Sequence, residues 1–153
     1  MPRGTFNGKR WCMYPNSHNE VLQRLNSHGL TPDFHHVDDE VGCIQSYDTN
    51  IMGRFLCNNS NCDVQGWSSK QIAITIRMYS GMKYNARVYY QRCRGCKRLS
   101  RPHMDHSYAE RVTYRIKKWS GIEVEVPPYT AQSNGPHETR LCEGCKHGHC
   151  SQR

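Results

Sequence analysis

Seven of the nine cysteines lie in three short clusters whose spacing suits the binding of a metal ion. The clusters comprise Cys57 and Cys62, Cys93 and Cys96, and Cys142, Cys145 and Cys150. Cysteines separated by two to four residues can turn both thiolates toward one ion, as they do in structural zinc sites. One such pair would be weak evidence, but three in one chain predict Zn²⁺ binding.

His137 precedes the last cluster by five residues and raises the number of soft ligands to eight. Tetrahedral Zn²⁺ takes four ligands, so eight ligands predict two closed sites, that is, two Zn²⁺ per chain. Spacing favours His137 as the fourth ligand of Cys142, Cys145 and Cys150. His147 and His149 lie in the same segment and remain alternatives.

A predicted hairpin indicates how the other four cysteines pair. Residues 71–78 alternate, with Ile72, Ile74, Ile76 and Met78 on one face, and residues 84–91 form a return strand after a turn at Ser80-Gly81. One cysteine pair precedes this hairpin and the other follows it, so Cys57, Cys62, Cys93 and Cys96 should meet at its open end as one site. The alternative pairs Cys57 and Cys62 with Cys142 and Cys145.

Other segments predict the elements around the hairpin. Residues 18–28 predict a short helix with a capping box at Ser17-Glu20, and residues 107–119 predict a longer helix capped by Ser107. Residues 122–126 alternate like a third strand, and the acidic residues 33–40 suggest a solvated loop. The fold class is therefore α+β, small and zinc-rich: an antiparallel zinc-ribbon-like hairpin extended to about three strands, packed with one or two helices. We expect an N-terminal arm with a short helix over residues 1–50 and a zinc-binding domain over residues 51–153.

The composition predicts a core that depends on metal. Only 36% of the residues are apolar and the mean hydropathy is −0.86. Because binding of structural Zn²⁺ contributes directly to folding, we expect the fold to be lost when the metal is removed. Cys12 and Cys43 stand alone and are expected to act as small hydrophobic residues.

Residues 87–118 contain ten Lys/Arg against Asp105 and Glu110, which accounts for the whole net charge of +8. Aromatic residues alternate with these cations, so the segment is a candidate for nucleic-acid binding. The candidate residues are Arg87, Arg92, Arg94, Lys97, Arg98 and Arg101. The competing interpretation is that the cations offset the thiolate charge around Cys93 and Cys96.

Catalysis is not expected, because two zinc ions with four protein ligands each have no position open for water. The deaminase, zincin, nucleophile-elbow and P-loop motifs do not occur, and no small-molecule substrate is expected. No apolar run suits a signal peptide or a membrane span, so we expect a cytoplasmic or nuclear protein without a membrane span. Reduced cysteines in such a compartment favour metal sites over disulfides.

The chain resembles the three-CxxC (3CxxC) type zinc-binding domain family, in a form similar to fungal members. The resemblance covers residues 52–150 and rests on GRFLCNNSNC, GWSSKQIAITIR, YNARVYYQRCRGC, SYAERVTYRIKKWSG and PHETRLCEGCKHGHC. The first cysteine pair departs from the family pattern, because four residues separate it and not two.

The resemblance implies zinc binding and a distant similarity to receptor-transporting proteins, which assist membrane receptors, and to zygote arrest proteins, which bind RNA. We therefore expect a zinc-binding, non-catalytic module that binds an unknown protein partner. The alternative is a zinc-dependent RNA-binding protein that uses residues 87–118.

Overall fold

The computed structural model describes residues 9–124 and 137–150. Its strands are β1 (Trp11–Cys12), β2 (Asp33–Phe34), β3 (Cys43–Leu56), β4 (Gly66–Tyr79), β5 (Lys83–Tyr89), β6 (Gln91–Arg92), β7 (Leu99–Ser100) and β8 (Pro102–Met104). Its α-helices are α1 (His18–Asn26), α2 (Ser107–Trp119) and α3 (Glu143–Lys146), with short 3-10 helices η1 (Pro15–Ser17) and η2 (Thr139–Leu141). The fold is α+β, as the sequence predicts.

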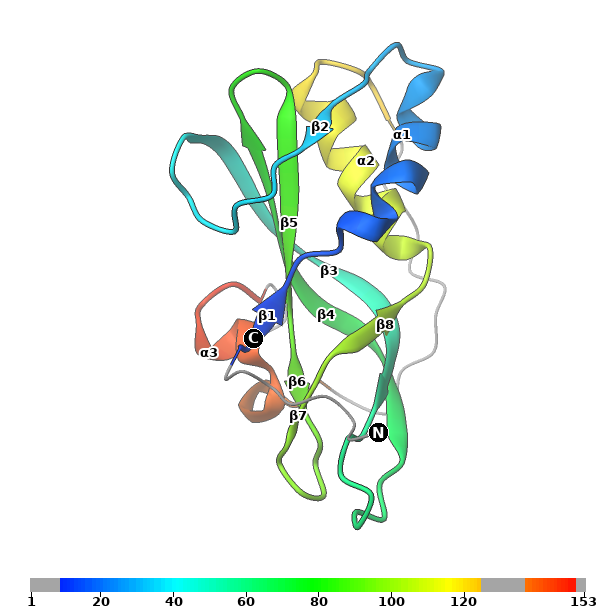
Figure 1. Ribbon diagram of the computed structural model, residues 1–153, viewed down its shortest axis with the longest axis vertical. Helices are drawn as coiled ribbons and strands as arrows, with labels where there is room; N and C mark the ends of the chain where they lie inside the picture. Colours follow the sequence, from blue (N-terminus) through cyan, green and yellow to red (C-terminus); the bar gives the residue numbers. More distant parts are fainter. Residues whose placement is uncertain (1–8, 125–136, 151–153) are drawn as a thin grey trace.

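Within the described residues, six strands form one sheet in the order β1-β5-β4-β3-β8, with β2 also beside β5. The β3–β4 and β4–β5 pairs are antiparallel, and β6 and β7 form a separate two-stranded sheet. Figure 1 shows α1 and α2 side by side near the closed end of the β4–β5 hairpin, with α3 beside the other part of the sheet. The predicted hairpin is thus the centre of a larger sheet.

One face of this sheet packs against α1 and α2. Ile72, Ile74 and Ile76 of β4 share a buried cluster with Val112 and Ile116 of α2. Val21 and Leu25 of α1 complete this cluster on the side of the N-terminal segment. The predicted alternation in β4 and both predicted helices are therefore confirmed.

The opposite face of β4 is also covered. Ala73 and Tyr89 pack against Cys142 and Cys150, so the C-terminal cysteine cluster covers this face. Arg77 is buried on the same face beside the acidic segment that follows β2. Because both faces are buried, a chain of modest apolar content still forms a two-sided core.

The predicted third strand lies elsewhere. Residues 122–124 form no strand, and the last residues of the predicted strand lie outside the described residues. The strand that extends the hairpin is β3, which pairs with β4 over most of its length. The strand prediction does not hold for residues 122–124, and β3 escapes prediction because its residues show little alternation.

Both predicted helix caps differ from the structure. Ser17 stands at the N-cap of α1, but its side chain makes no capping bond, and Glu20 pairs with Arg24 at 3.3 Å. Ser107 is the first residue of α2 and bonds to β3: its hydroxyl accepts from the Met52 N–H at 2.7 Å and donates to the Met52 carbonyl at 3.1 Å. This contact fixes the start of α2 on the sheet.

The acidic segment is not the solvated loop that its composition suggests. The Asp38 carboxylate accepts from Arg77 Nη1 at 3.0 Å and from Arg87 Nε at 2.8 Å. The backbone carbonyl of Asp39 accepts from the hydroxyl of Tyr79 and from Arg77. The segment thus provides the anionic partners of two arginines of the sheet.

The N-terminal residues contribute to the same sheet as the zinc-binding region. The expected boundary between residues 50 and 51 falls inside β3, and β1 pairs with β5. The division into an arm and a domain remains a prediction. No helix among the described residues is long and apolar enough to cross a membrane.

Candidate metal centres

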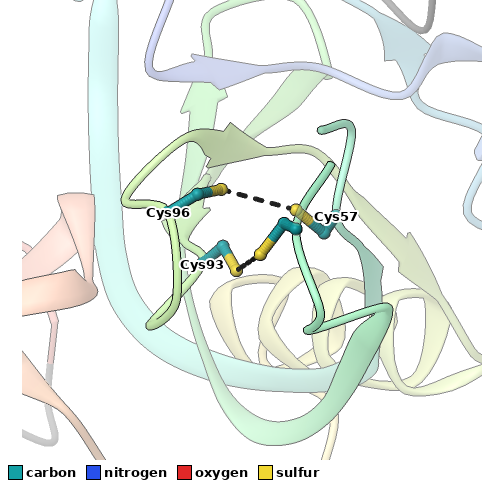
Figure 2. Close-up of side chains that lie close together, drawn as sticks. Cys57, Cys93 and Cys96 are labelled. Atoms are coloured by element: carbon teal, nitrogen blue, oxygen red, sulfur yellow. Dashed lines mark hydrogen bonds between the residues drawn. The ribbon is translucent and has the colours of Figure 1, made fainter. Parts of the chain in front are cut away.

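The first cluster joins two loops at one end of the sheet. Cys57 and Cys62 belong to the loop between β3 and β4, and Cys93 and Cys96 to the turn between β6 and β7. All four sulfur atoms lie within 4.8 Å of one another. Figure 2 shows Cys57, Cys93 and Cys96 with their sulfurs turned inward. The two cysteine pairs thus meet where the hairpin argument places them.

Backbone hydrogen bonds shape both loops. The Lys97 N–H donates to the Cys93 carbonyl at 2.8 Å, and Lys97 itself has a φ of 65°, which is uncommon for a residue other than glycine. In the other loop the Cys62 N–H donates to the Asn59 carbonyl at 3.1 Å. That turn at Asn59 accommodates the four-residue spacing of the first pair.

The two loops approach each other closely at Gly95. A Cβ at this position would lie 3.0 Å from the Cys62 sulfur and 2.9 Å from a methyl group of Val64. The absence of a side chain at Gly95 therefore lets the turn at residues 93–96 approach Cys62 and its loop.

The sulfur geometry of this cluster fits Zn²⁺. Zn–S bonds of about 2.3 Å in a regular tetrahedron place neighbouring sulfurs about 3.8 Å apart. The Cys57 and Cys96 sulfurs are 3.6 Å apart, and those of Cys62 and Cys93 are 3.7 Å apart. Disulfide bonding is excluded for these pairs at such distances, because a disulfide needs about 2.05 Å.

Thiol ionisation differs across the first cluster. Burial raises the pKa of Cys57 to about 12. Burial acts in the same direction on Cys96, but a backbone hydrogen bond at Arg98 and the neighbouring thiols lower its pKa to about 6. Cys57 and Cys96 therefore ionise in different pH ranges without a cation, whereas a bound divalent ion would favour the thiolate form of its ligands.

The second cluster lies on the face of the sheet opposite α1 and α2. His137, Cys142, Cys145 and Cys150 place their ligand atoms within 4.8 Å of one another. His137 Nε2 is 3.3 Å from the Cys145 sulfur and 3.5 Å from the Cys150 sulfur. A tetrahedron with Zn–N of about 2.0 Å and Zn–S of about 2.3 Å predicts roughly 3.5 Å for this edge, so these residues also fit Zn²⁺.

A backbone N–H and a side-chain amide donate hydrogen bonds to the sulfurs of this cluster. The Cys145 N–H donates to the Cys142 sulfur at 3.4 Å, and the Asn50 amide of β3 donates to the Cys150 sulfur at 3.6 Å. Such donors orient a thiolate and offset its charge. The hydrogen bond with the Cys150 thiol, followed by burial, raises the pKa of Cys142, so a bound cation would favour its thiolate form.

A buried carboxylate supports α3, the helix that begins inside the cluster. Glu143 has no exposed surface and accepts from Arg10 Nη1 at 2.7 Å, with Arg92 and Lys146 at 3.4 Å. Burial alone would raise the pKa of Glu143, but the Arg10 hydrogen bond and the charges of Lys146 and Arg92 lower it overall. Glu143 thus links the second cluster to the N-terminal residues and to the turn of the first.

The two alternative histidines have other contacts. His147 lies edge-on to Trp11, with ring centroids 5.2 Å apart. His149 stacks on Tyr89, and its Nδ1 lies 3.1 Å from a carboxylate oxygen of Asp48. Of the three candidate histidines, the structure brings only His137 to the thiols.

Asn50, Glu143 and Asp48 surround the second cluster but were not among the residues singled out from the sequence. Asn50 follows a polar stretch of β3, and Glu143 lies between two ligands. Single polar residues of this kind carry no spacing signal, so only their position in the fold identifies them.

Most of the candidate nucleic-acid residues are engaged within the chain. Arg87 binds Asp38, Arg92 contacts Glu143, and the Lys97 ammonium donates to the Arg94 carbonyl at 2.6 Å. Arg101 lies over the Tyr14 ring, 4.7 Å from its centroid. Arg94 and Arg98 have exposed side chains at the turn that follows β6. Four of the six candidate residues thus make contacts within the chain, and the role of the set in binding RNA remains a prediction.

The comparisons with known proteins agree with the two clusters. The family model of the 3CxxC zinc ribbon, described as a zinc-binding domain, matches residues 50–148. That range includes every residue of the two clusters except Cys150. No curated protein and no solved structure matches the chain.

Proposed function

Because this chain belongs to the 3CxxC zinc-ribbon family of zinc-binding domains, we propose that it is a non-catalytic protein-interaction module held together by two structural zinc ions. The observation that supports this proposal is that both clusters supply four protein ligand atoms each. Cys57, Cys62, Cys93 and Cys96 would hold one ion, and His137, Cys142, Cys145 and Cys150 the other. Four-coordinate closed sites are characteristic of structural zinc.

The surroundings of the first cluster support a non-catalytic role. A cavity of about 780 Å³ borders Cys57 and Cys62, and its lining includes Arg101 and His103 but no carboxylate. Hydrolysis at such a site would need an open metal position and a general base beside it. With all four cysteines bound to the ion, no metal position would remain open, so His103 would have no metal-bound water to activate.

We expect two zinc ions per chain by elemental analysis of the purified protein. Cys57→Ser should reduce the content to about one ion, since three ligands hold structural Zn²⁺ much less tightly than four. The matched control is Cys43→Ser, which removes a thiol outside both clusters and should leave two ions. A folded wild-type protein with one ion or none would contradict the proposal.

A protein partner is favoured over RNA because intramolecular contacts use four of the six candidate cations. We therefore expect weak binding of single-stranded oligouridine, little changed by Arg94→Ala together with Arg98→Ala. The RNA alternative predicts tight binding whose logarithm falls with the logarithm of salt by roughly 0.7 per phosphate neutralised. A steep slope that the double variant flattens would replace the present proposal by the RNA alternative.

The same proposal places the protein in the cytoplasm or nucleus. Two sites built mostly from thiolates need reduced cysteines, and those compartments keep thiols reduced. All nine cysteines are free thiols here, which supports this assignment. Localisation of a tagged full-length chain by microscopy would test it.

A further inference from the structure

Along the first half of β3, one edge of the main sheet has no further strand among the described residues. The opposite edge, at β5, is paired with both β1 and β2. On the β3 side, β8 pairs only with residues 53–55, so along residues 43–49 the single strand partner within the described ranges is β4. These seven residues contain no lysine and no proline, the residues that commonly protect a sheet edge from further pairing.

An apolar groove lies at the start of this edge. A cavity of about 400 Å³ is lined by Ile44, Met78, Met82 and Trp119, among others. A bulge between Cys43 and Gln45 leaves Ile44 without a partner on β4, and its side chain is 61% exposed at the groove. Bulges redirect side chains in this way, so the local irregularity presents an apolar side chain to solvent.

Cations flank the same edge further along. Tyr47, 42% exposed, lies opposite Ile76 and therefore faces the helix side of the sheet. The guanidinium carbon of Arg115 in α2 is 3.3 Å from the centroid of the Tyr47 ring. Lys118, one helical turn later, is exposed and lies 5.7 Å from the Tyr114 ring centroid. The edge thus has an apolar end at Ile44 and a cationic side at α2.

We propose that residues 43–49 of β3 bind an extended segment of a partner protein as an added strand, with an apolar side chain of that segment in the Ile44 groove and an acidic one beside Arg115 and Lys118. This inference rests on the proposed function and specifies its partner. Main-chain hydrogen bonds along a free edge supply affinity, and side-chain pockets on one face supply specificity. Apolar and acidic residues about two to four positions apart in the partner would reach both features on one face.

The chemistry of the edge distinguishes this occupant from two others. A nucleic acid would make no use of the apolar groove at Ile44 and Met82. A second copy of the chain would bring the same cations of α2 against each other, because a symmetric interface pairs a patch with itself. An acidic, partly apolar peptide complements both ends of the surface.

The test is selection from a random peptide library of about eight residues, long enough to span the edge, on the full-length zinc-loaded protein. Selected peptides should alternate apolar and polar residues and be enriched in Asp and Glu. Ile44→Glu should weaken a selected peptide by roughly tenfold or more, since it removes an apolar contact and adds repulsion of the acidic peptide. Lys118→Glu should weaken it by about three- to tenfold and reduce its salt dependence.

Matched controls carry the same substitutions elsewhere. Val37→Glu changes a similarly exposed apolar side chain that does not line the groove. Lys9→Glu reverses an exposed charge on a residue that is distant in sequence from both β3 and α2. Both should bind the peptide as the wild type does. Bound peptide should also slow amide hydrogen exchange within residues 43–49, a readout that a contact made only by side chains would not change.

Several outcomes would overturn the inference. Peptides that bind equally well to Ile44→Glu, or an absence of enriched peptides, would reject the β3 edge as a peptide site. Displacement of the peptide by oligouridine would also reject it. A dimer detected by light scattering and dissociated by Ile44→Glu would do the same. The proposed function is judged separately, by zinc content and by zinc-dependent capture of proteins from lysate, so it can stand when the edge proposal fails.

Discussion

At the residue scale, the two turns with cysteines three positions apart, residues 93–96 and 142–145, have one feature in common. Each has a glycine directly before its second cysteine, in Cys93-Arg94-Gly95-Cys96 and Cys142-Glu143-Gly144-Cys145. At both positions a side chain would collide with a neighbouring element: with Val64 and the Cys62 sulfur at Gly95, and with Ala73 at Gly144. Close packing around each turn therefore requires glycine at this position, in addition to the requirement that ligand spacing places on the cysteines.

Gly144→Ala should destabilise the protein, because the new Cβ would lie 2.3 Å from the Cβ of Ala73. We expect a loss of about 3 kcal/mol in the free energy of unfolding, the upper end of the range for overpacked sites. Denaturant unfolding of the zinc-loaded protein measures it. Adding Ala73→Gly removes the collision and should restore all but the roughly 1 kcal/mol that glycine costs in a strand. A double variant no more stable than Gly144→Ala would refute the packing explanation.

Ligand residues are the part of this protein most visible in its sequence. Cysteine spacing predicts the ligands, since ligand geometry constrains positions only a few residues apart, and the predicted hairpin indicates which of them share a site. Spacing favours His137 but leaves His147 and His149 as alternatives, and the contacts of those two with Trp11, Tyr89 and Asp48 in the fold separate them from the ligand. Supporting residues such as Asn50 come from a distant strand, so no local pattern announces them.

At the scale of the elements, predictions succeeded where large apolar residues recur regularly on one face of a strand or helix. β4 and α2 bury apolar residues at regular intervals, so their periods of two and 3.6 residues are readable. β3 combines an exposed first half with a buried second half, and residues at its centre contact the second cluster. β1 and β2 have two residues each, which is too short for any period.

The acidic segment after β2 shows how composition can mislead about an element. Its charge suggests solvent, but Asp38 compensates two arginines on the sheet. The side chain of Arg77 is 2% exposed, and its Nε has no hydrogen-bond partner. Asp38 is therefore the main counter-charge of a buried cation.

Asp38→Asn should lower the free energy of unfolding by roughly 2–3 kcal/mol. Removing one member of a buried ion pair costs about 3–5 kcal/mol, and the partial exposure of Asp38 reduces that value. Denaturant unfolding would measure the loss. Glu40→Gln removes an exposed charge two residues away and should stay within about 0.5 kcal/mol of the wild type. Equal effects of the two substitutions would indicate a general charge effect in place of a specific pairing.

At the scale of the whole molecule, the two clusters hold different parts of the chain together. The first joins the β3–β4 loop to the turn after β6. The second closes the face of β4 and β5 that the helices leave open, where it packs on Ala73 and Tyr89. Glu143 connects them, because it contacts Arg92 beside the first cluster while lying between two ligands of the second. The low apolar content of the sequence predicts the need for metal. It does not predict which parts of the chain each cluster joins, because that depends on long-range contacts.

Removal of zinc should therefore abolish the cooperative fold. Structural Zn²⁺ contributes of order 10 kcal/mol per site, comparable with the roughly 5–15 kcal/mol total stability of a domain. We expect the melting transition seen by circular dichroism to disappear in a strong chelator under reducing conditions and to return when Zn²⁺ is added back. Cys93→Ser, which breaks the first cluster, should unfold much of the protein even in zinc. Cys12→Ser changes a half-buried thiol of β1 outside both clusters, so its transition should stay close to that of the wild type. If the chelated wild type kept its transition, the apolar core on the helix face would be sufficient to stabilise the fold by itself. The ions would then serve only to shape the two cysteine clusters.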